Sequence, residues 1–170
     1  MTASAEALAL VRVDNRLVHG QVLEAWLPAL RAQGLVVADD EAAGSLLSRS
    51  AMALAIPPKV ELRVLTVAAA AALLRPGGTA PVAARTILLL REVRDAAALH
   101  ELGVPLPRLN LGNVHFRAGR RQVSPSVFLD LGELEILERL AAAGTEVELR
   151  AVPAEPALTL AVARARFAAG

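Results

Sequence analysis

The sequence predicts an α/β protein: a three-layer open twisted sheet, mainly parallel with an antiparallel edge element, and helices on both faces. Two observations predict this fold class. Short apolar runs alternate with longer helical patterns, which is the order of βαβ units. The apolar runs are also continuous rather than alternating, as expected for strands whose two faces are both covered by helices. The chain has 170 residues, which suits a single domain over 1–170.

The first half of the chain contains four predicted strands, which cover residues 7–13, 34–39, 60–66 and 86–90. The helices between them are expected over residues 20–34, over roughly 41–55, and over an Ala-rich stretch ending at Leu74. We expect Pro28 to disturb the first helix and Gly34 to stop it. The segment RPGGTAP at 75–81 is the clearest loop.

The second half continues the alternation, with a helix ending near Gly103 and a strand over 108–112. Three further features are expected: short strand-like pieces within 114–128 around a turn at Gly119, a strand over 146–152, and a helical tail after Glu155. Asp130 and Glu133 have the D-x-x-E spacing that caps a helix, here over 131–143, and Gly144 ends it.

In open sheets of this kind, ligands bind at the carboxyl ends of the strands. The candidate loops are therefore residues 14–20, 39–41, 66–68, 75–81 and 112–115.

Composition excludes several classes of function. The 17 arginines and the single lysine, Lys59, are dispersed and matched by 17 acidic residues, which argues against a nucleic-acid binder. The absence of cysteine excludes disulfides and thiolate metal sites, and it suits a reducing cytoplasm. The N-terminal residues do not have the pattern of a signal peptide, and no uncharged apolar stretch reaches the length of a membrane span. We therefore expect a cytoplasmic protein.

The segment RVDNRLVHGQV at 12–22 carries the strongest chemical signal, because it places a carboxylate, a guanidinium and an imidazole together between a strand and a helix. A neutral imidazole such as that of His19 is a competent nucleophile near neutral pH. Arg16 can supply a fork of donors to a phosphate, and Asp14 can orient either Arg16 or the imidazole N–H. Gly20 would let the backbone approach the phosphate. The same pattern also fits a helix-capping or surface histidine beside a structural Asp14–Arg16 ion pair.

The segment 12–22 resembles the active-site signature of enzyme IIB proteins of the mannose/fructose/sorbose family of the bacterial sugar phosphotransferase system, usually written R-I-D-D-R-L-I-H-G-Q-V. The likeness continues in the family's order through most of residues 8 to 156. It includes LVVADDEAAG (35–44), TILLLREV (86–93), LGVPLPRLNLGNVHF (102–116) and GTEVELRAVP (144–153).

The resemblance implies site residues one by one. His19 matches the histidine that is phosphorylated in the family, with attack through Nδ1. Arg16 matches the arginine that steadies the phosphate, and Asp14 matches the acid beside that arginine. Thr66 matches a Ser/Thr position that would donate to the phosphate.

Other matched positions are weaker. Asn15, Gly20 and Arg12 are further phosphate-site candidates, although Arg12 lies further back on the strand and has a structural interpretation. Asn110, Gly112 and Asn113 are candidates for the same rim, although turn geometry explains them equally well. Asn15 stands where the family usually has a second Asp, which removes a negative charge near the phosphate.

The resemblance also implies an activity, that of a protein-phosphohistidine–sugar phosphotransferase (EC 2.7.1 type). The chain would accept a phosphoryl group from a phosphohistidine on IIA and pass it to a sugar taken up through the membrane partners IIC and IID. Its length leaves no room for a fused IIA domain, so IIA is expected on a separate polypeptide. No metal or other cofactor is implied, and a homodimer is left open.

Two other functions stay open from the residues alone. One is a non-transport regulator that is phosphorylated on His19 to control a protein partner, to which Asn15 gives some weight. The other is an anion- or nucleotide-binding module with no covalent step. His100 is expected on the surface late in a helix, and His115 at the rim of the site without a chemical role. The three histidines lack metal-ligand spacing, and PGG at 76–78 lacks the Lys and Ser/Thr of a P-loop.

Overall fold

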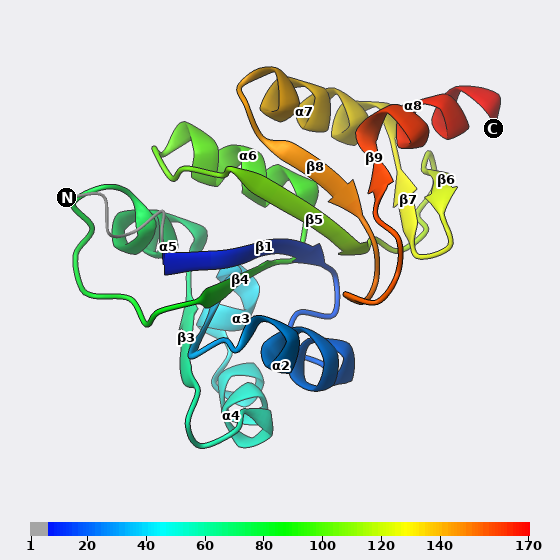
Figure 1. Cartoon of the computed structure of the whole chain (residues 1–170). Helices are drawn as coiled ribbons and strands as arrows, with labels where there is room; N and C mark the ends of the chain where they lie inside the picture. The colour runs from blue at the N-terminus through cyan, green and yellow to red at the C-terminus, as the bar shows by residue number, and fades with distance from the viewer. Residues whose placement is uncertain (1–6) are drawn as a thin grey trace.

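The computed structural model describes residues 7–170, which form a seven-stranded sheet with helices on both faces (Figure 1). In spatial order the strands are β3 (Glu61–Leu65), β2 (Gly34–Ala38), β4 (Thr86–Leu90), β1 (Leu8–Asp14), β5 (Arg108–Asn113), β8 (Glu146–Leu149) and β9 (Leu158–Thr159). Every neighbouring pair is parallel except β8 and β9, which pair antiparallel at one edge. The predicted fold class is confirmed.

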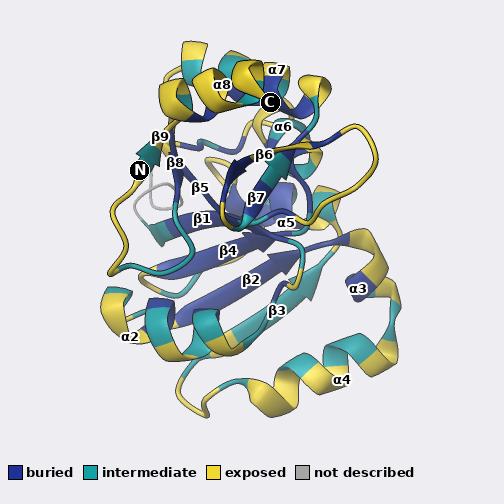
Figure 2. Ribbon diagram, turned by 90° about the vertical axis from the view of Figure 1, so that its right-hand side faces the viewer, coloured by how far each residue is buried: buried dark blue, intermediate teal, exposed yellow. Residues whose placement is uncertain are grey.

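The helices divide between the two faces of the sheet (Figure 2). One face is covered by the π-helical turn η1 (Val22–Trp26), α2 (Leu27–Leu30), α3 (Asp40–Gly44) and α4 (Leu46–Ala55). The other face is covered by α5 (Val67–Leu74), α6 (Val93–Glu101), α7 (Leu131–Ala142) and α8 (Leu160–Ala169). Crossovers toward the β3 edge use the first face and crossovers toward the β9 edge use the second, as one constant handedness requires.

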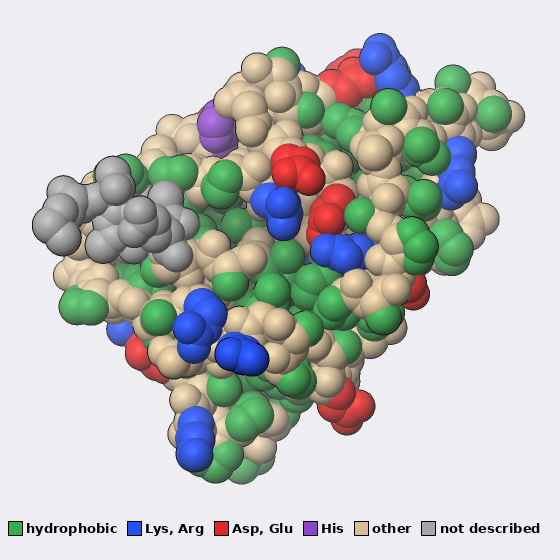
Figure 3. Space-filling model, in the orientation of Figure 1, with side chains coloured by type: hydrophobic (Ala, Val, Ile, Leu, Met, Phe, Trp, Pro, Cys, Tyr) green, Lys and Arg blue, Asp and Glu red, His purple; other side chains and the backbone are tan. Residues whose placement is uncertain are grey.

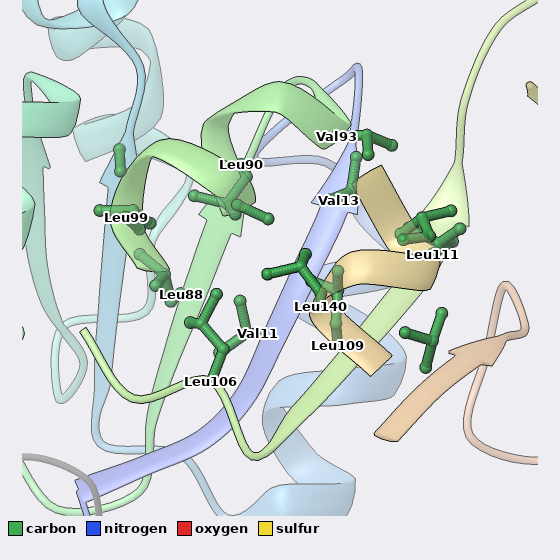
Figure 4. Packing of buried hydrophobic residues seen from close by; sticks show 14 of the residues in the cluster. Val11, Val13, Leu88, Leu90, Val93, Leu99, Leu106, Leu109, Leu111 and Leu140 are labelled. Atoms are coloured by element: carbon green, nitrogen blue, oxygen red, sulfur yellow. The ribbon is translucent and has the colours of Figure 1, made fainter. Parts of the chain in front are cut away.

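The alternation of side chains along β1 decides where the site lies. Val11 and Val13 point into the larger core with Leu88 and Leu90 of β4, against α6 and α7 (Figure 4). Successive side chains of a strand point to opposite faces, so Arg12 and Asp14 point toward η1 instead. Both are fully buried.

The loop after β1 occupies a topological switch point. After β1 the chain continues to β2, toward the β3 edge of the sheet. After β4, which lies beside β1, it continues to β5, toward the β9 edge. Open α/β sheets bind ligands at the carboxyl ends of strands whose connections depart in opposite directions in this way. Residues 14–20 begin at this point.

The helix predicted over 41–55 is two helices. Ser45 has extended backbone angles, φ −105° and ψ 111°, and its hydroxyl accepts a hydrogen bond from the Ser48 N–H at 3.1 Å. The helix α3 therefore ends before Ser45, and Ser45 becomes the N-cap of α4, because its side chain satisfies a free helical N–H.

The boundary predicted at Gly34 was also wrong. The first helical segment ends at Arg31, which has a left-handed φ of 48°, and Pro28 lies in the first turn of α2, where its ring is tolerated. Gly34 is the first residue of β2, and a Cβ there would lie 2.5 Å from the Thr86 hydroxyl oxygen. Close strand packing, and not helix termination, explains this glycine.

Two further expectations need correction, and a third needs refinement. The loop 75–81 follows α5 and leads toward β4, so it lies at the amino edge of the sheet, away from the candidate site. The last predicted strand ends at Leu149, and the tail contributes β9 before it becomes helical. The turn predicted at Gly119 is present, with φ 87° and a 3.0 Å hydrogen bond from the Arg120 N–H to the Arg117 carbonyl. It precedes the hairpin of β6 (Arg121–Ser124) and β7 (Val127–Leu129) and does not join these two strands.

Among residues 7–170, no helix is long and apolar enough to cross a membrane. On the face drawn in Figure 3, basic and acidic side chains are scattered among apolar ones, so that face carries no broad patch of one charge.

Candidate active site

The loop between β1 and η1 is held in a strained turn by Leu17. Leu17 has a left-handed φ of 57°, and its N–H donates to the Asp14 carbonyl at 2.9 Å. Its side chain is buried in the core under η1, which holds this uncommon conformation in place. The turn at the buried Leu17 reverses the chain direction, and this brings the His19 ring into contact with Asp14.

The Asp14 carboxylate is the hub of the site. Its Oδ2 contacts Nε2 of His19 at 2.8 Å, and it also accepts from the Arg12 guanidinium at 2.9 Å. Arg16 donates to both carboxylate oxygens, each at 3.1 Å, and its backbone N–H donates to Oδ1 at 3.1 Å. Asp14 therefore contacts Arg16 and His19, the other two proposed catalytic residues, and also Arg12.

Charge and hydrogen bonding keep Asp14 ionised. Burial alone would raise the pKa of Asp14, but hydrogen bonds from His19 and Arg16 and the charge of Arg12 lower it to well below its ordinary value. Burial lowers the pKa of the Arg12 guanidinium, and the Asp14 carboxylate opposes that shift. An ionised carboxylate only accepts hydrogen bonds.

The tautomer of His19 follows from these contacts. Because Asp14 is ionised, Nε2 of His19 carries the proton of the shared hydrogen bond. Nδ1 accepts a long hydrogen bond from the Gln21 backbone N–H at 3.3 Å, so it has no proton of its own. The contacts therefore assign the ring proton to Nε2 and leave Nδ1 as the hydrogen-bond acceptor.

The surroundings of Nδ1 suit an anion. The His19 side chain is 15% exposed and that of Arg16 is 37% exposed, so both reach the surface. Gln21 accepts from the Arg16 guanidinium at 2.9 Å and aims it across the start of the helical segment. A Cβ on Gly20 would meet nothing within 4 Å apart from its chain neighbours, so no other part of the described chain covers this residue. The start of a helical segment and a partly exposed arginine are features that favour a phosphate.

Arg12 lies below Asp14 in a closely fitted slot. It donates to Oδ1 of Asn110 at 2.7 Å, and its guanidinium lies 5.3 Å from the ring centre of Trp26. A Cβ on Gly112 would lie 1.9 Å from Cζ of Arg12, so only glycine leaves room for the guanidinium. Asn110 and Gly112 thus contact Arg12 rather than forming the outer rim.

Two matched positions lie apart from the imidazole. Asn15 donates to the Arg91 carbonyl at 2.7 Å and accepts from the His115 N–H, so its amide joins the ends of β4 and β5. Thr66 follows β3, which lies three strands from β1, and its hydroxyl caps α5 by accepting from the Ala69 N–H at 3.1 Å. The structure does not bring Asn15 or Thr66 to Nδ1.

Sequence reasoning missed Leu17, Gln21 and Glu148, which accepts from Asn110 at 3.2 Å. An apolar residue in the middle of a polar loop was the available signal for Leu17. His100 is exposed on α6, and His115 is exposed, with its Nδ1 3.2 Å from the Asn113 amide.

Comparison with known proteins agrees with this geometry. Residues 8–163 match the family model described as "PTS system sorbose subfamily IIB component", where PTS is the phosphotransferase system. The N-acetylgalactosamine-specific phosphotransferase enzyme IIB component 2 of Escherichia coli K12 is 30% identical over 153 residues, covering 90% of this chain and 96% of that protein.

The mannose-specific EIIAB component of E. coli K12 is 32% identical over 154 residues. That match covers 90% of this chain but 47% of the relative, so the chain spans about half the length of that protein.

Solved structures give the same result. ManxB of Thermoanaerobacter tengcongensis has a TM-score of 0.85 and 27% identity, with 94% of this chain and 96% of that chain covered. The IIBSor domain of the sorbose permease of Klebsiella pneumoniae has a TM-score of 0.83 and 25% identity, with 93% and 96% covered. The match to the family model includes every residue of the site around Asp14. The chain therefore belongs to the sorbose-subfamily IIB components of the phosphotransferase system.

Proposed function

We propose that this chain accepts a phosphoryl group on Nδ1 of His19 and transfers it to a sugar during uptake. The observation that carries the proposal is the contact of His19 Nε2 with the buried carboxylate of Asp14 at 2.8 Å, which assigns the ring proton to Nε2 and leaves Nδ1 unprotonated on a partly exposed ring. A nucleophile with an oriented partner and an adjacent cationic fork is the arrangement that phosphoryl transfer uses.

In the first step, the Nδ1 lone pair forms a bond to phosphorus while the bond from phosphorus to the donor's imidazole nitrogen breaks. Positive charge develops on the His19 ring, and the Asp14 carboxylate stabilises it through the Nε2–H bond. Arg16 is the candidate to neutralise the equatorial oxygens, because its guanidinium is held by Gln21 and by Asp14, the residue that also contacts His19.

In the second step, a sugar hydroxyl oxygen forms a bond to phosphorus while the bond from phosphorus to Nδ1 breaks. The electron pair of that bond returns to Nδ1 of His19, and the hydroxyl proton passes to solvent. The donor in this proposal is a phosphohistidine on a IIA protein, and the sugar arrives through the membrane components IIC and IID. The reaction takes place on the cytoplasmic side. A homodimer stays a prediction.

The alternative is a regulator that is phosphorylated on His19 and controls a protein partner. It depended on Asn15 in place of the usual Asp. The Asn15 amide is engaged with backbone groups of two neighbouring loops, so it is better explained by loop packing than by a change of function. The two functions differ in where the phosphate goes: the transport function predicts loss to a sugar in membranes that contain IIC and IID.

The experiment is incubation with phosphoenolpyruvate, enzyme I, HPr and the cognate IIA, followed by mass spectrometry. We expect one acid-labile, base-stable phosphate on His19, absent in His19→Ala and retained in His100→Ala, whose ring is exposed on α6. A phosphate that persists in His19→Ala would contradict the proposal.

A further inference from the structure

The burial of Arg12 is hard to explain by stability. Its side chain has no solvent exposure, and its Nε–H has no hydrogen-bond partner within the described part of the chain. Removing a charge from water costs more than an ion pair usually returns, and a buried unpaired donor adds to that cost. A hydrophobic side chain of similar volume would serve the core at least as well, which points to a functional reason for the guanidinium.

A series of side-chain contacts through Arg12 connects β8 with His19. Glu148 on β8 accepts from Asn110, and Asn110 on β5 accepts from Arg12 at 2.7 Å. Arg12 then donates at 2.9 Å to Oδ2 of Asp14, which is the same oxygen that contacts Nε2 of His19. The chain of side chains crosses three neighbouring strands and ends on the imidazole.

The slot around Arg12 fixes the guanidinium in one place. Trp26 packs against it, with Cζ of Arg12 5.3 Å from the ring centre, and Trp26 is itself held by a 2.9 Å hydrogen bond to the Ala151 carbonyl. Gly112 forms the wall of the slot, because a Cβ at this position would lie 1.9 Å from Cζ of Arg12, much closer than van der Waals contact. A planar fork held in this way can fix the direction of the carboxylate that it contacts.

We propose that Arg12, held by Asn110 and seated against Gly112, is a positioning residue that sets the orientation of Asp14 and thereby keeps the proton of His19 on Nε2. The inference rests on the proposed function, because it concerns how His19 is prepared to accept phosphate. Arg12 acts through Asp14 and does not touch the transferred group.

The test uses Gly112→Ala, which changes neither a charge nor a side chain that contacts His19. The added methyl group displaces the Arg12 guanidinium. In 1H–15N spectra of the full chain, we expect the His19 Nε2–H signal to exchange with water at least about ten-fold faster than in the wild type. Phosphoryl acceptance from IIA should fall about ten-fold or more, since small misplacements of reacting groups cost this much.

Gly44→Ala is the matched control, because a Cβ there meets nothing within 4 Å. It should leave both readouts within about two-fold of the wild type, as expected for an unhindered position. Asn110→Leu is the second variant, which removes the shorter of the two hydrogen bonds that Nη1 of Arg12 donates, at 2.7 Å to Asn110 and 3.3 Å to the Arg150 carbonyl, and it should change both readouts in the same direction as Gly112→Ala. It decides the question if Gly112→Ala does not fold.

Two results distinguish failure of the positioning role of Arg12 from failure of the proposed function. If folded variants keep the wild-type Nε2–H signal and transfer rate, the positioning role of Arg12 is overturned while the proposed function stands. If the wild type accepts no phosphate but Gly112→Ala loses the Nε2–H signal, the proposed function fails and the positioning role is supported.

Discussion

Two buried arginines of this chain have similar surroundings and different consequences. Arg12 has no exposure and Arg120 has 3%, and both contact carboxylates. All three nitrogens of Arg120 are paired: Nε to Glu133 at 3.0 Å, Nη1 to the His115 carbonyl at 2.6 Å, and Nη2 to Glu133 and Glu92. Arg12 leaves Nε unpaired, and its carboxylate contacts a partly exposed imidazole.

The difference lies in what the carboxylates do next. Glu133 also accepts from the Asp130 N–H at 2.9 Å in the capping box of α7, so the Arg120 cluster joins a loop to a helix start and satisfies its own members. Asp14 instead distributes its two oxygens among Arg12, Arg16 and His19. Burial and ion pairing are common to both clusters; the feature that makes the Asp14 cluster the candidate site is the partly exposed imidazole at its surface end.

The largest expected effect separates the two clusters by chemistry. Asp14→Asn keeps the size of the side chain but removes the charge that holds the Nε2–H tautomer. We expect phosphoryl acceptance to fall about 10³-fold, by analogy with loss of the orienting acid in a catalytic triad. Rapid-quench measurement of labelled His19 gives the rate, and a loss below about ten-fold would mean that Asp14 is only structural.

Arg120→Met tests the opposite side of the comparison. It leaves Glu133 and Glu92 without their buried partner, so we expect the free energy of unfolding to fall by about 3 kcal/mol. The folded variant should accept phosphate at a rate within about two-fold of the wild type. Urea unfolding measures the first quantity, and the transfer assay measures the second. A strong loss of transfer in the folded protein would make the Arg120 cluster functional too.

Arg16→Ala examines the exposed arginine that shares Asp14 with Arg12. Because its charge is placed to act on the transferring phosphoryl group, we expect transfer to fall about 10²-fold, with little change in stability. Arg16→Lys should recover only part of the loss, since an ammonium lacks the planar fork. Equal rates for the wild type and Arg16→Ala would remove Arg16 from the site.

The smallest expected effect is the loss of stability at acid pH that comes from protonation of Asp14. Its pKa is lowered in the folded protein, so its contribution to stability is present above the unfolded value near 3.9 and is lost as pH falls through the folded value. We expect this contribution, on the order of 2 kcal/mol, to disappear between about pH 5 and pH 1. Asp14→Asn should have a shallower loss of stability over this range, measured by urea unfolding at each pH. Asp39, whose pKa is lowered by hydrogen bonds from Arg91, keeps part of the slope in both proteins.

The sequence predicted the sheet well because continuous apolar runs and intervening helical patterns are local signals. The helix boundaries at Ser45 and Gly34 were wrong because a serine cap and a close contact with Thr86 depend on local geometry and on a neighbouring strand. A pattern within one segment does not contain either contact.

The candidate site was partly predictable for the same reason. His19, Arg16 and Asp14 lie within six residues, so their contact could be expected from the strand, loop and helix that carry them. The support for Arg12 comes from Asn110 and Gly112 on β5, almost one hundred residues later, and only the strand order brings them together. The strand order also places Thr66 three strands away from β1.

The central claim is that Asp14 holds the proton on Nε2 of His19 and leaves Nδ1 to take the phosphate. The most direct measurement is 1H–15N and 31P NMR of the 15N-labelled protein before and after phosphorylation by IIA. The account predicts an Nε2–H signal in both states and a phosphorus atom bonded to Nδ1 of His19. Phosphorus on Nε2, or on any residue other than His19, would contradict it.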